Sequence, residues 1–130
     1  MAASNMPREL QRMALSFLEL AREEAATGYK TKDMRHVREA AEKAWLASLQ
    51  AVDAAMRRHG QGPEPGPLAH RARTDFLEGS GRRDLADRLR VFADKLHGSY
   101  FYIGEVPLEP AMNLCLDEVE AFVHELETAL

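Results

Sequence analysis

The sequence predicts an all-α fold: an antiparallel four-helix, up-and-down bundle with a short extra helix between the second and third long helices. Apolar residues recur every three or four positions through most of the 130 residues, which is the spacing of amphipathic helices. No stretch alternates apolar and polar residues as a strand would. The expected connections are short, which favours antiparallel neighbours. A chain of this length fits one domain, which we assign to residues 1–130.

The first helix is predicted from about Pro7 to Ala26. Asn5 is a suitable cap, a proline suits the first turn, and Gly28 is the expected stop. One apolar stripe follows the helical repeat and should face the core; it consists of Leu10, Met13, Ala14, Phe17, Leu18 and Ala21.

The second helix should begin near Thr31 or Lys32 and continue to about His59. It carries two stripes, and Trp45 lies between them as a core or interface anchor. The main stripe contains Val37, Ala41, Ala44, Ser48, Val52, Ala55 and Met56. The second stripe contains small residues only: Ala40, Ala47, Ala51 and Ala54. Since one bundle core buries one stripe per helix, the second stripe predicts another contact surface and a homodimer.

Three further helices are expected after the glycine- and proline-rich connection at residues 60–67. A short helix from Leu68 to Leu77 should end at the Gly79-Ser80-Gly81 break. A long helix should follow from about Arg82 to Tyr100. The last helix, from about Pro110 to Leu130, should bury Met112, Cys115, Leu116, Val119, Phe122, Val123 and Leu126.

The composition indicates a globular protein of a reducing compartment. Hydrophobic residues make up 45% and charged residues 29% of the chain, which excludes disordered and collagen-like classes. Cys115 is the single cysteine, so no intramolecular disulfide can form. We find no signal-peptide pattern and no apolar run of the ~20 residues needed to span a bilayer. We therefore expect a cytoplasmic protein with no membrane association.

Charge is distributed unevenly along the chain. Residues 104–130 contain seven acids and no Lys or Arg, whereas residues 30–59 contain seven basic residues against four acids, and residues 68–103 seven against five. This contrast suits electrostatic pairing within a bundle or across a dimer. A local basic groove for a polyanion such as RNA is the alternative interpretation.

A metal centre and a cofactor site are not expected. Di-iron helical bundles require Glu-x-x-His pairs that face inward, and the chain contains no such pair. Asp33 with His36, and Glu120 with His124, are spaced to share a helix face, but neither pair has a companion. No phosphate-binding glycine loop of a nucleotide-binding fold is present. Cys115 falls on an apolar stripe, where a buried, inert thiol is expected.

The third long helix carries the candidate site. Arg90, Asp94 and His97 are four and three residues apart, so on an α-helix all three side chains share one face. Asp94 could fix the tautomer of His97, while Arg90 could stabilise phosphate charge through two hydrogen bonds. The alternative is a surface ion pair of Arg90 with Asp94, with His97 capping the last carbonyls of the helix.

The chain resembles a known family in two places. The break Thr27-Gly28-Tyr29 after the first helix, followed by Val37 to Trp45, is similar to the opening helical pair of HEPN domains and their PaREP-like relatives. Arg90, six residues, and then His97 also fit the Arg-to-His spacing typical of HEPN ribonucleases. The resemblance implies a four- or five-helix bundle that commonly dimerises. Its members include metal-independent ribonucleases and the toxin or partner half of nucleotidyltransferase pairs.

The resemblance implies that Arg90 holds a phosphate and that His97 is the general acid or base for a ribose 2′-hydroxyl. Toxin-type members often place a tyrosine two residues after the histidine. Here Ser99 occupies that position and Tyr100 follows, about 100° further around an α-helix. Two functions are therefore open: an RNA-binding or RNA-cleaving protein acting through these residues, and a non-catalytic interaction module such as the partner of a nucleotidyltransferase.

Overall fold

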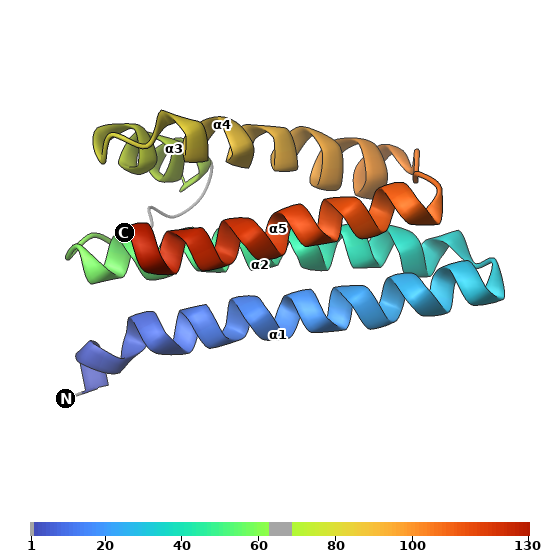
Figure 1. Ribbon diagram of the computed structural model, residues 1–130, viewed down its shortest axis with the longest axis horizontal. Coiled ribbons are helices and arrows are strands. Elements are labelled where there is room, and N and C mark those ends of the chain that lie inside the picture. Colours follow the sequence, from blue (N-terminus) through green and yellow to red (C-terminus); the bar gives the residue numbers. More distant parts are fainter. Residues whose placement is uncertain (1, 63–68) are drawn as a thin grey trace.

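The computed structural model describes residues 2–62 and 69–130, with side chains from Met6 onward, and these residues are helical apart from short connections (Figure 1). The prediction of an all-helical chain is confirmed for the part that is described. The elements in chain order are α1 (Ala2–Thr31), α2 (Met34–Arg58), α3 (Ala69–Gly79), α4 (Arg83–Phe92), η2 (Ala93–Ile103) and α5 (Glu109–Ala129). The predicted connection at residues 60–67 and the first predicted residue of the short helix, Leu68, fall largely outside the described residues.

The first helix is longer than predicted at both ends, because neither Pro7 nor Gly28 limits it. Gly28 lies within α1, and its role is to allow close packing. A Cβ atom at Gly28 would lie 2.7 Å from Cγ2 of Val37 and 3.0 Å from the carbonyl oxygen of Asp33. The chain reverses instead at Lys32, whose φ of 58° is left-handed. Asp33 then caps α2 by accepting a hydrogen bond from the backbone N–H of Arg35.

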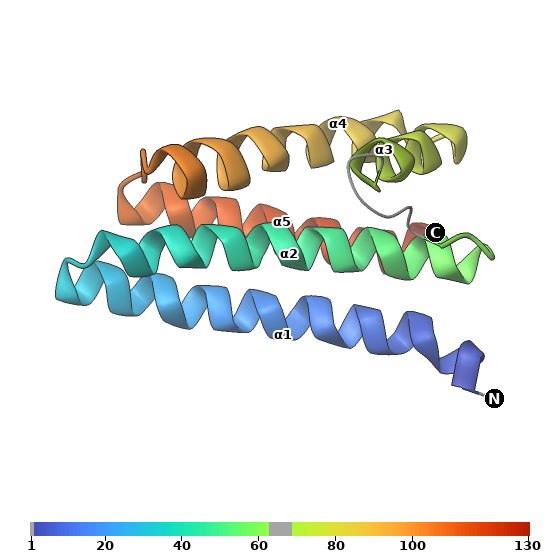
Figure 2. The same cartoon turned by 180° about the vertical axis from the view of Figure 1, so that it is seen from behind.

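Both stripes of α2 are buried within one chain, which overturns our reason for predicting a dimer through this helix. The small-residue stripe (Ala40, Ala47, Ala51 and Ala54) is as inaccessible as the main stripe. The cause is the central position of α2, which packs against all the other helices, α1, α3, α4, η2 and α5. Small side chains on α2 and on α1 let these two helices pack closely near the turn that joins them, and the helices diverge toward the N-terminus of α1 (Figures 1 and 2).

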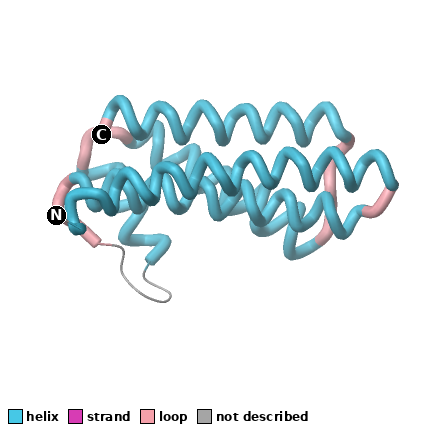
Figure 3. Tube along the Cα trace, turned by 90° about the horizontal axis from the view of Figure 1, so that it is seen from below, coloured by secondary structure: helices cyan, strands magenta, loops and turns pink. Residues whose placement is uncertain are grey.

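The helices form a central pair with a layer on each side. Figure 1 shows α1 along one edge, α2 and α5 in the middle, and α3 and α4 along the opposite edge. Among the described helices, α1 packs against α2 and α5. The long helices run side by side and are joined at their ends (Figure 3). The position of α1 at the edge explains why Met13, predicted to be in the core, is 45% exposed.

The predicted third long helix changes its pitch at Phe92. Residues Arg83–Phe92 are α-helical, and the same rod continues from Ala93 to Ile103 as a π-helix, in which N–H groups bond five residues back. The rod ends at Gly104, which has a φ of 88° and donates its N–H to the carbonyl oxygen of Ser99. The sequence did not predict this change, because the apolar spacing of the segment fits an α-helix.

Part of the acidic last segment is paired with arginines of the same chain, in line with one of our two interpretations of the charge pattern. Arg22 of α1 donates to Asp117 at 2.8 Å, and both Arg82 and Arg88 donate to Glu125. All predicted core residues of α5 are buried. None of the described helices combines the length and hydrophobicity needed to cross a membrane.

Candidate functional site

The four predicted site residues lie on both sides of the change in pitch. Arg90 is in the last turn of α4, whereas Asp94, His97 and Tyr100 are in the π-helical segment. The wider π-helical turn rotates successive side chains by a smaller angle than the α-helix assumed in our prediction. The four side chains consequently have different neighbours.

Arg90 joins α4 to α3. Its Nη2 donates to Glu78 Oε1 at 2.5 Å, and its Nη1 donates to Asp87 Oδ1 at 2.9 Å. The expected ion pair of Arg90 with Asp94 is therefore replaced by two other carboxylates. The hydrogen bond that Arg90 donates to Glu78 is the main reason why the pKa of Arg90 is raised. Two carboxylates thus already supply acceptor oxygens to the guanidinium, which is the role that a bound phosphate would have.

His97 is oriented by Glu42 of α2, and our prediction that Asp94 fixes its tautomer is wrong. The Nδ1 atom of His97 lies 2.9 and 3.0 Å from the two carboxylate oxygens of Glu42. An ionised carboxylate only accepts hydrogen bonds, so the Nδ1–H of His97 donates to it. In the neutral imidazole, Nε2 then carries the lone pair. In this arrangement the carboxylate of Glu42 orients the imidazole of His97, as carboxylates do for histidines that transfer protons or bind metals.

Aromatic rings surround this histidine. The ring of His97 stacks on Phe101, with centroids 6.0 Å apart and planes 22° apart. Trp45, which is 8% exposed, lies with its ring centroid 6.1 Å from His97 and 6.0 Å from His70 of α3. Trp45 is therefore a core anchor, as expected, whose ring lies near two exposed imidazoles.

The pKa of His70 is also shifted by its surroundings in this region. Burial lowers its pKa, and the positive charges of Arg73 and Arg90 lower it further, while Asp94 acts in the opposite direction. Arg73 itself is fixed by Asp53 of α2 through two hydrogen bonds of 2.8 and 3.1 Å. His70 thus lies near Trp45 and within electrostatic range of the predicted residues Arg90 and Asp94.

Asp94 and Tyr100 contribute to a separate open groove of about 420 Å³. Its lining residues are Val91, Asp94, Lys95, Ser99, Tyr100 and Glu105. Burial raises the pKa of Tyr100, so its hydroxyl stays protonated at neutral pH. Arg90 and His97 do not line this groove, so it does not unite the four predicted residues.

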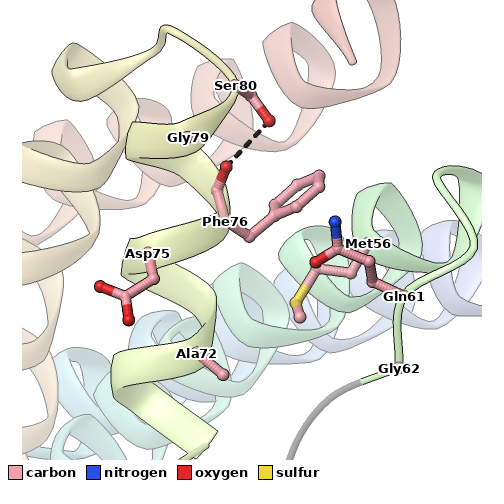
Figure 4. A pocket seen from close by; sticks show the side chains of 8 residues that line it. All are labelled: Met56, Gln61, Gly62, Ala72, Asp75, Phe76, Gly79 and Ser80. Carbon is pink, nitrogen blue, oxygen red and sulfur yellow. Dashed lines mark hydrogen bonds between the residues drawn. The ribbon is translucent and has the colours of Figure 1, made fainter.

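Another hollow, of about 410 Å³, lies where the end of α2 meets α3 (Figure 4). The ring of Phe76 and the side chain of Met56 face it, and Ser80 donates to the carbonyl oxygen of Phe76 at 2.8 Å. Among the described residues that line it, Asp75 is the one ionisable side chain. These residues therefore offer volume but no acid–base pair.

Metal and thiol chemistry have little support in the described part of the chain. Within residues 2–62 and 69–130, no three His, Cys, Asp or Glu side chains gather in a way that could hold a metal ion. Cys115 is buried as predicted, and burial raises its pKa to about 11, so the thiol is protonated at neutral pH.

Sequence reasoning singled out Arg90 and His97 but did not identify the carboxylates that contact them. Glu78 and Glu42 come from other helices, and Glu42 is 55 residues away from His97 in the chain. No spacing rule along one helix can identify such a partner. Chemically, this arrangement orients the imidazole of His97 through Glu42 and stacks it on Phe101. The charges of Arg73 and Arg90 are neutralised by carboxylates.

The chain was compared with protein-family models, with curated proteins and with solved structures, and none of these matches it. The resemblance to HEPN domains therefore stays a prediction.

Proposed function

We propose that the protein is a non-catalytic, cytoplasmic interaction module built as an antiparallel four-helix bundle, with α3 as the extra short helix. The observation that carries this proposal is the pairing of Arg90 with Glu78 and Asp87. A phosphate-binding arginine needs open donors and positive surroundings. Arg90 donates hydrogen bonds to two carboxylates, and through Glu78 it connects α4 to α3, which is a structural role.

The electrostatics of the whole region support the same proposal. Arg73 donates to Asp53, Arg90 to Glu78 and Asp87, and His97 to Glu42. Each of these three basic groups is matched by at least one carboxylate, which lowers the excess positive charge that polyanion binding would require of them. Among the partner classes that the HEPN-like resemblance implies, a nucleotidyltransferase is the one that a non-catalytic module would bind.

The test compares Arg90→Gln with Arg83→Gln, a matched change at an exposed arginine of the same helix. If Arg90 is a structural clamp, Arg90→Gln lowers the melting temperature more than Arg83→Gln does. Glu78→Gln should cause a similar loss, and the double variant Arg90→Gln with Glu78→Gln should lose less than the sum. The proposal is contradicted if Arg90→Gln leaves the melting temperature unchanged and abolishes binding of single-stranded RNA.

An RNA-cleaving protein is the second candidate, and one observation favours it. His97 is oriented by Glu42 and stacks on the half-buried ring of Phe101, an aromatic group of the kind on which unpaired bases stack. In this proposal Nε2 of His97 takes the proton of a ribose 2′-hydroxyl, and the 2′-oxygen attacks the adjacent phosphorus. The bond from phosphorus to the 5′-oxygen of the next nucleotide breaks, and the protonated His97 returns the proton to that oxygen. The reaction leaves a cyclic phosphate and needs no metal.

End-labelled single-stranded RNA incubated with the protein in chelator tests this candidate. His97→Ala should lower the cleavage rate by about 10² to 10⁴, since that is the usual contribution of a general acid or base. His124→Ala, at an exposed histidine of α5, is the matched control and should cleave normally. Equal cleavage by wild type and His97→Ala would indicate a contaminating nuclease and would exclude this function.

A further inference from the structure

We propose that the outer face of the α1–α2 hairpin binds a second copy of this chain, with α1 of each copy packed over α2 of the other. This inference goes beyond the proposed function, and it does not depend on the roles of Arg90 and His97. It assigns a contact surface different from the buried α2 stripe on which the sequence-based prediction of a dimer rested.

The first observation is an apolar stripe on α1 that faces solvent. Met6, Met13 and Leu20 are seven residues apart, and they are 38%, 45% and 48% exposed. Leu10 and Phe17 lie between them in the sequence and are half-buried. The combined spacing of four, three, four and three residues is the pattern of a helix that packs along a second helical surface.

The stripe is additional to the face that α1 uses inside its own chain. Ala14, Leu18, Ala21 and Ala25 make that inner face and are buried. An ordinary surface helix has one apolar face, and its other side is polar. Since α1 lies along one edge of the molecule, the helices of the same chain that contact it, α2 and α5, leave the outer stripe exposed (Figure 2).

The second observation is that α2 continues the same outer face. Lys43 donates to Glu24 at 2.8 Å, which fixes how the antiparallel helices α1 and α2 are aligned. Counting back along both helices from this contact brings Leu20 about level with Leu46. Leu46 is 36% exposed. The hairpin thus presents the apolar stripe of α1 beside one exposed leucine of α2.

Charge complementarity selects the second copy as the occupant and sets its orientation. A twofold axis parallel to the hairpin places α1 over α2 of the second copy without any shift along the helices. Residues of α1 and α2 that lie at the same height within one hairpin therefore also lie at the same height across the two copies. Exposed Glu9 comes level with exposed Arg57 of the second copy, and Leu20 with Leu46. Glu23 comes level with Lys43 in the same way.

The other face-to-face orientation is disfavoured by the same charges. If α1 packed antiparallel on α1 of the second copy along its stripe, Glu9 would approach Glu23, because both border the stripe on the same side. Like charges at such flanking positions destabilise helix pairs. The observed distribution of charge therefore favours the arrangement of α1 over α2.

Sedimentation equilibrium of the full chain tests the proposal. The wild type should reach twice the chain mass at micromolar concentration. Leu20→Glu and Met13→Glu should each raise the dissociation constant of the dimer by at least about tenfold, because each buries an unpaired carboxylate in the contact. Leu114→Glu changes a similarly exposed leucine on α5 and should leave the dissociation constant unchanged. Circular dichroism verifies that each variant is folded.

A charge exchange tests the orientation. Glu9→Arg and Arg57→Glu should each weaken the dimer, and the double variant Glu9→Arg with Arg57→Glu should restore it. A monomer at every concentration that stays in solution would overturn the proposal, and so would a dimer that Leu114→Glu breaks and Leu20→Glu does not. Failure of the double variant to restore a dimer would overturn the proposed orientation. None of these results bears on the melting and RNA experiments that test the proposed function.

Discussion

The two sides of α2 are packed in opposite ways. Toward α1, the contact consists of small residues, and Gly28 brings the backbone of α1 against Val37. Toward α4, η2 and α5, the core consists of large side chains, and the main ones are Leu85, Leu89, Phe92, Leu96 and Phe122. The hairpin is stabilised by close approach of two helices, and the other side by filled volume. Added atoms should therefore damage the first contact, and removed atoms the second.

The largest expected effect is on the side with large residues. Phe92 is buried, and its ring meets that of Phe122 edge to face with centroids 5.3 Å apart. Phe92→Ala should lower the free energy of unfolding by about 3–5 kcal/mol, because it leaves a cavity and removes the aromatic contact. Urea denaturation measures the loss. Val91→Ala, at the exposed neighbouring position, should change stability by less than about 0.5 kcal/mol. Similar losses in both variants would contradict the comparison.

The hairpin should respond to the addition of a single methyl group. Gly28→Ala places a Cβ atom 2.7 Å from Val37 Cγ2, and we expect a loss of about 1–3 kcal/mol despite the better helix propensity of alanine. Gly79→Ala is the matched control, since a Cβ atom there meets nothing within 4 Å, and it should be neutral or slightly stabilising.

A second variant separates crowding from other causes. If contact with Val37 is responsible, Gly28→Ala combined with Val37→Ala should lose less stability than the two single changes together. Strict additivity in urea denaturation would show that the hairpin has room for the methyl group.

This contrast also shows which parts of the fold the sequence could predict. The helix α5 and its core positions follow from a regular apolar spacing, so both were predicted correctly. Gly28 was misread as a stop, because glycine is frequent at helix ends and its close approach to Val37 depends on a second helix. The burial of both α2 stripes likewise depends on how many helices surround α2, which no pattern within α2 contains.

The candidate site was less predictable for a related reason. The common face of Arg90, Asp94 and His97 assumed an α-helix throughout, and the π-helical segment that begins at Ala93 removes that assumption. The carboxylates that hold Arg90 and His97 come from α3, α4 and α2. Long-range contacts of this kind are decided by packing, and local spacing does not encode them.

A smaller effect is expected from the ion pair that spans the hairpin. The hydrogen bond from Lys43, and then that from His36, hold the pKa of Glu24 below its usual 4.5. A lowered carboxyl pKa gives stability that is present above the unfolded value and is lost as the pH falls through the folded value. Lys43→Met should therefore cost about 0.5–1 kcal/mol at neutral pH, and the difference from wild type should shrink in acid. Urea denaturation at several pH values measures it. An equal difference in acid would assign the cost to lost packing.

The smallest expected effect is on the other side of α2, at His70. Burial, then Arg73 and Arg90, lower the pKa of this histidine below its usual 6.5, and Asp94 raises it. The unfolded chain therefore binds the proton first as the pH falls, so the contribution of His70 to stability is present above 6.5 and is lost as the pH falls through the folded value. Proton NMR of the imidazole should show that Arg90→Gln raises this pKa and that Asp94→Asn lowers it further. The Arg83→Gln variant is the matched control and should leave the His70 titration unchanged. If the Arg90 and Asp94 variants titrate like the wild type, His70 does not sense the charge of either residue, and the predicted site does not influence this histidine.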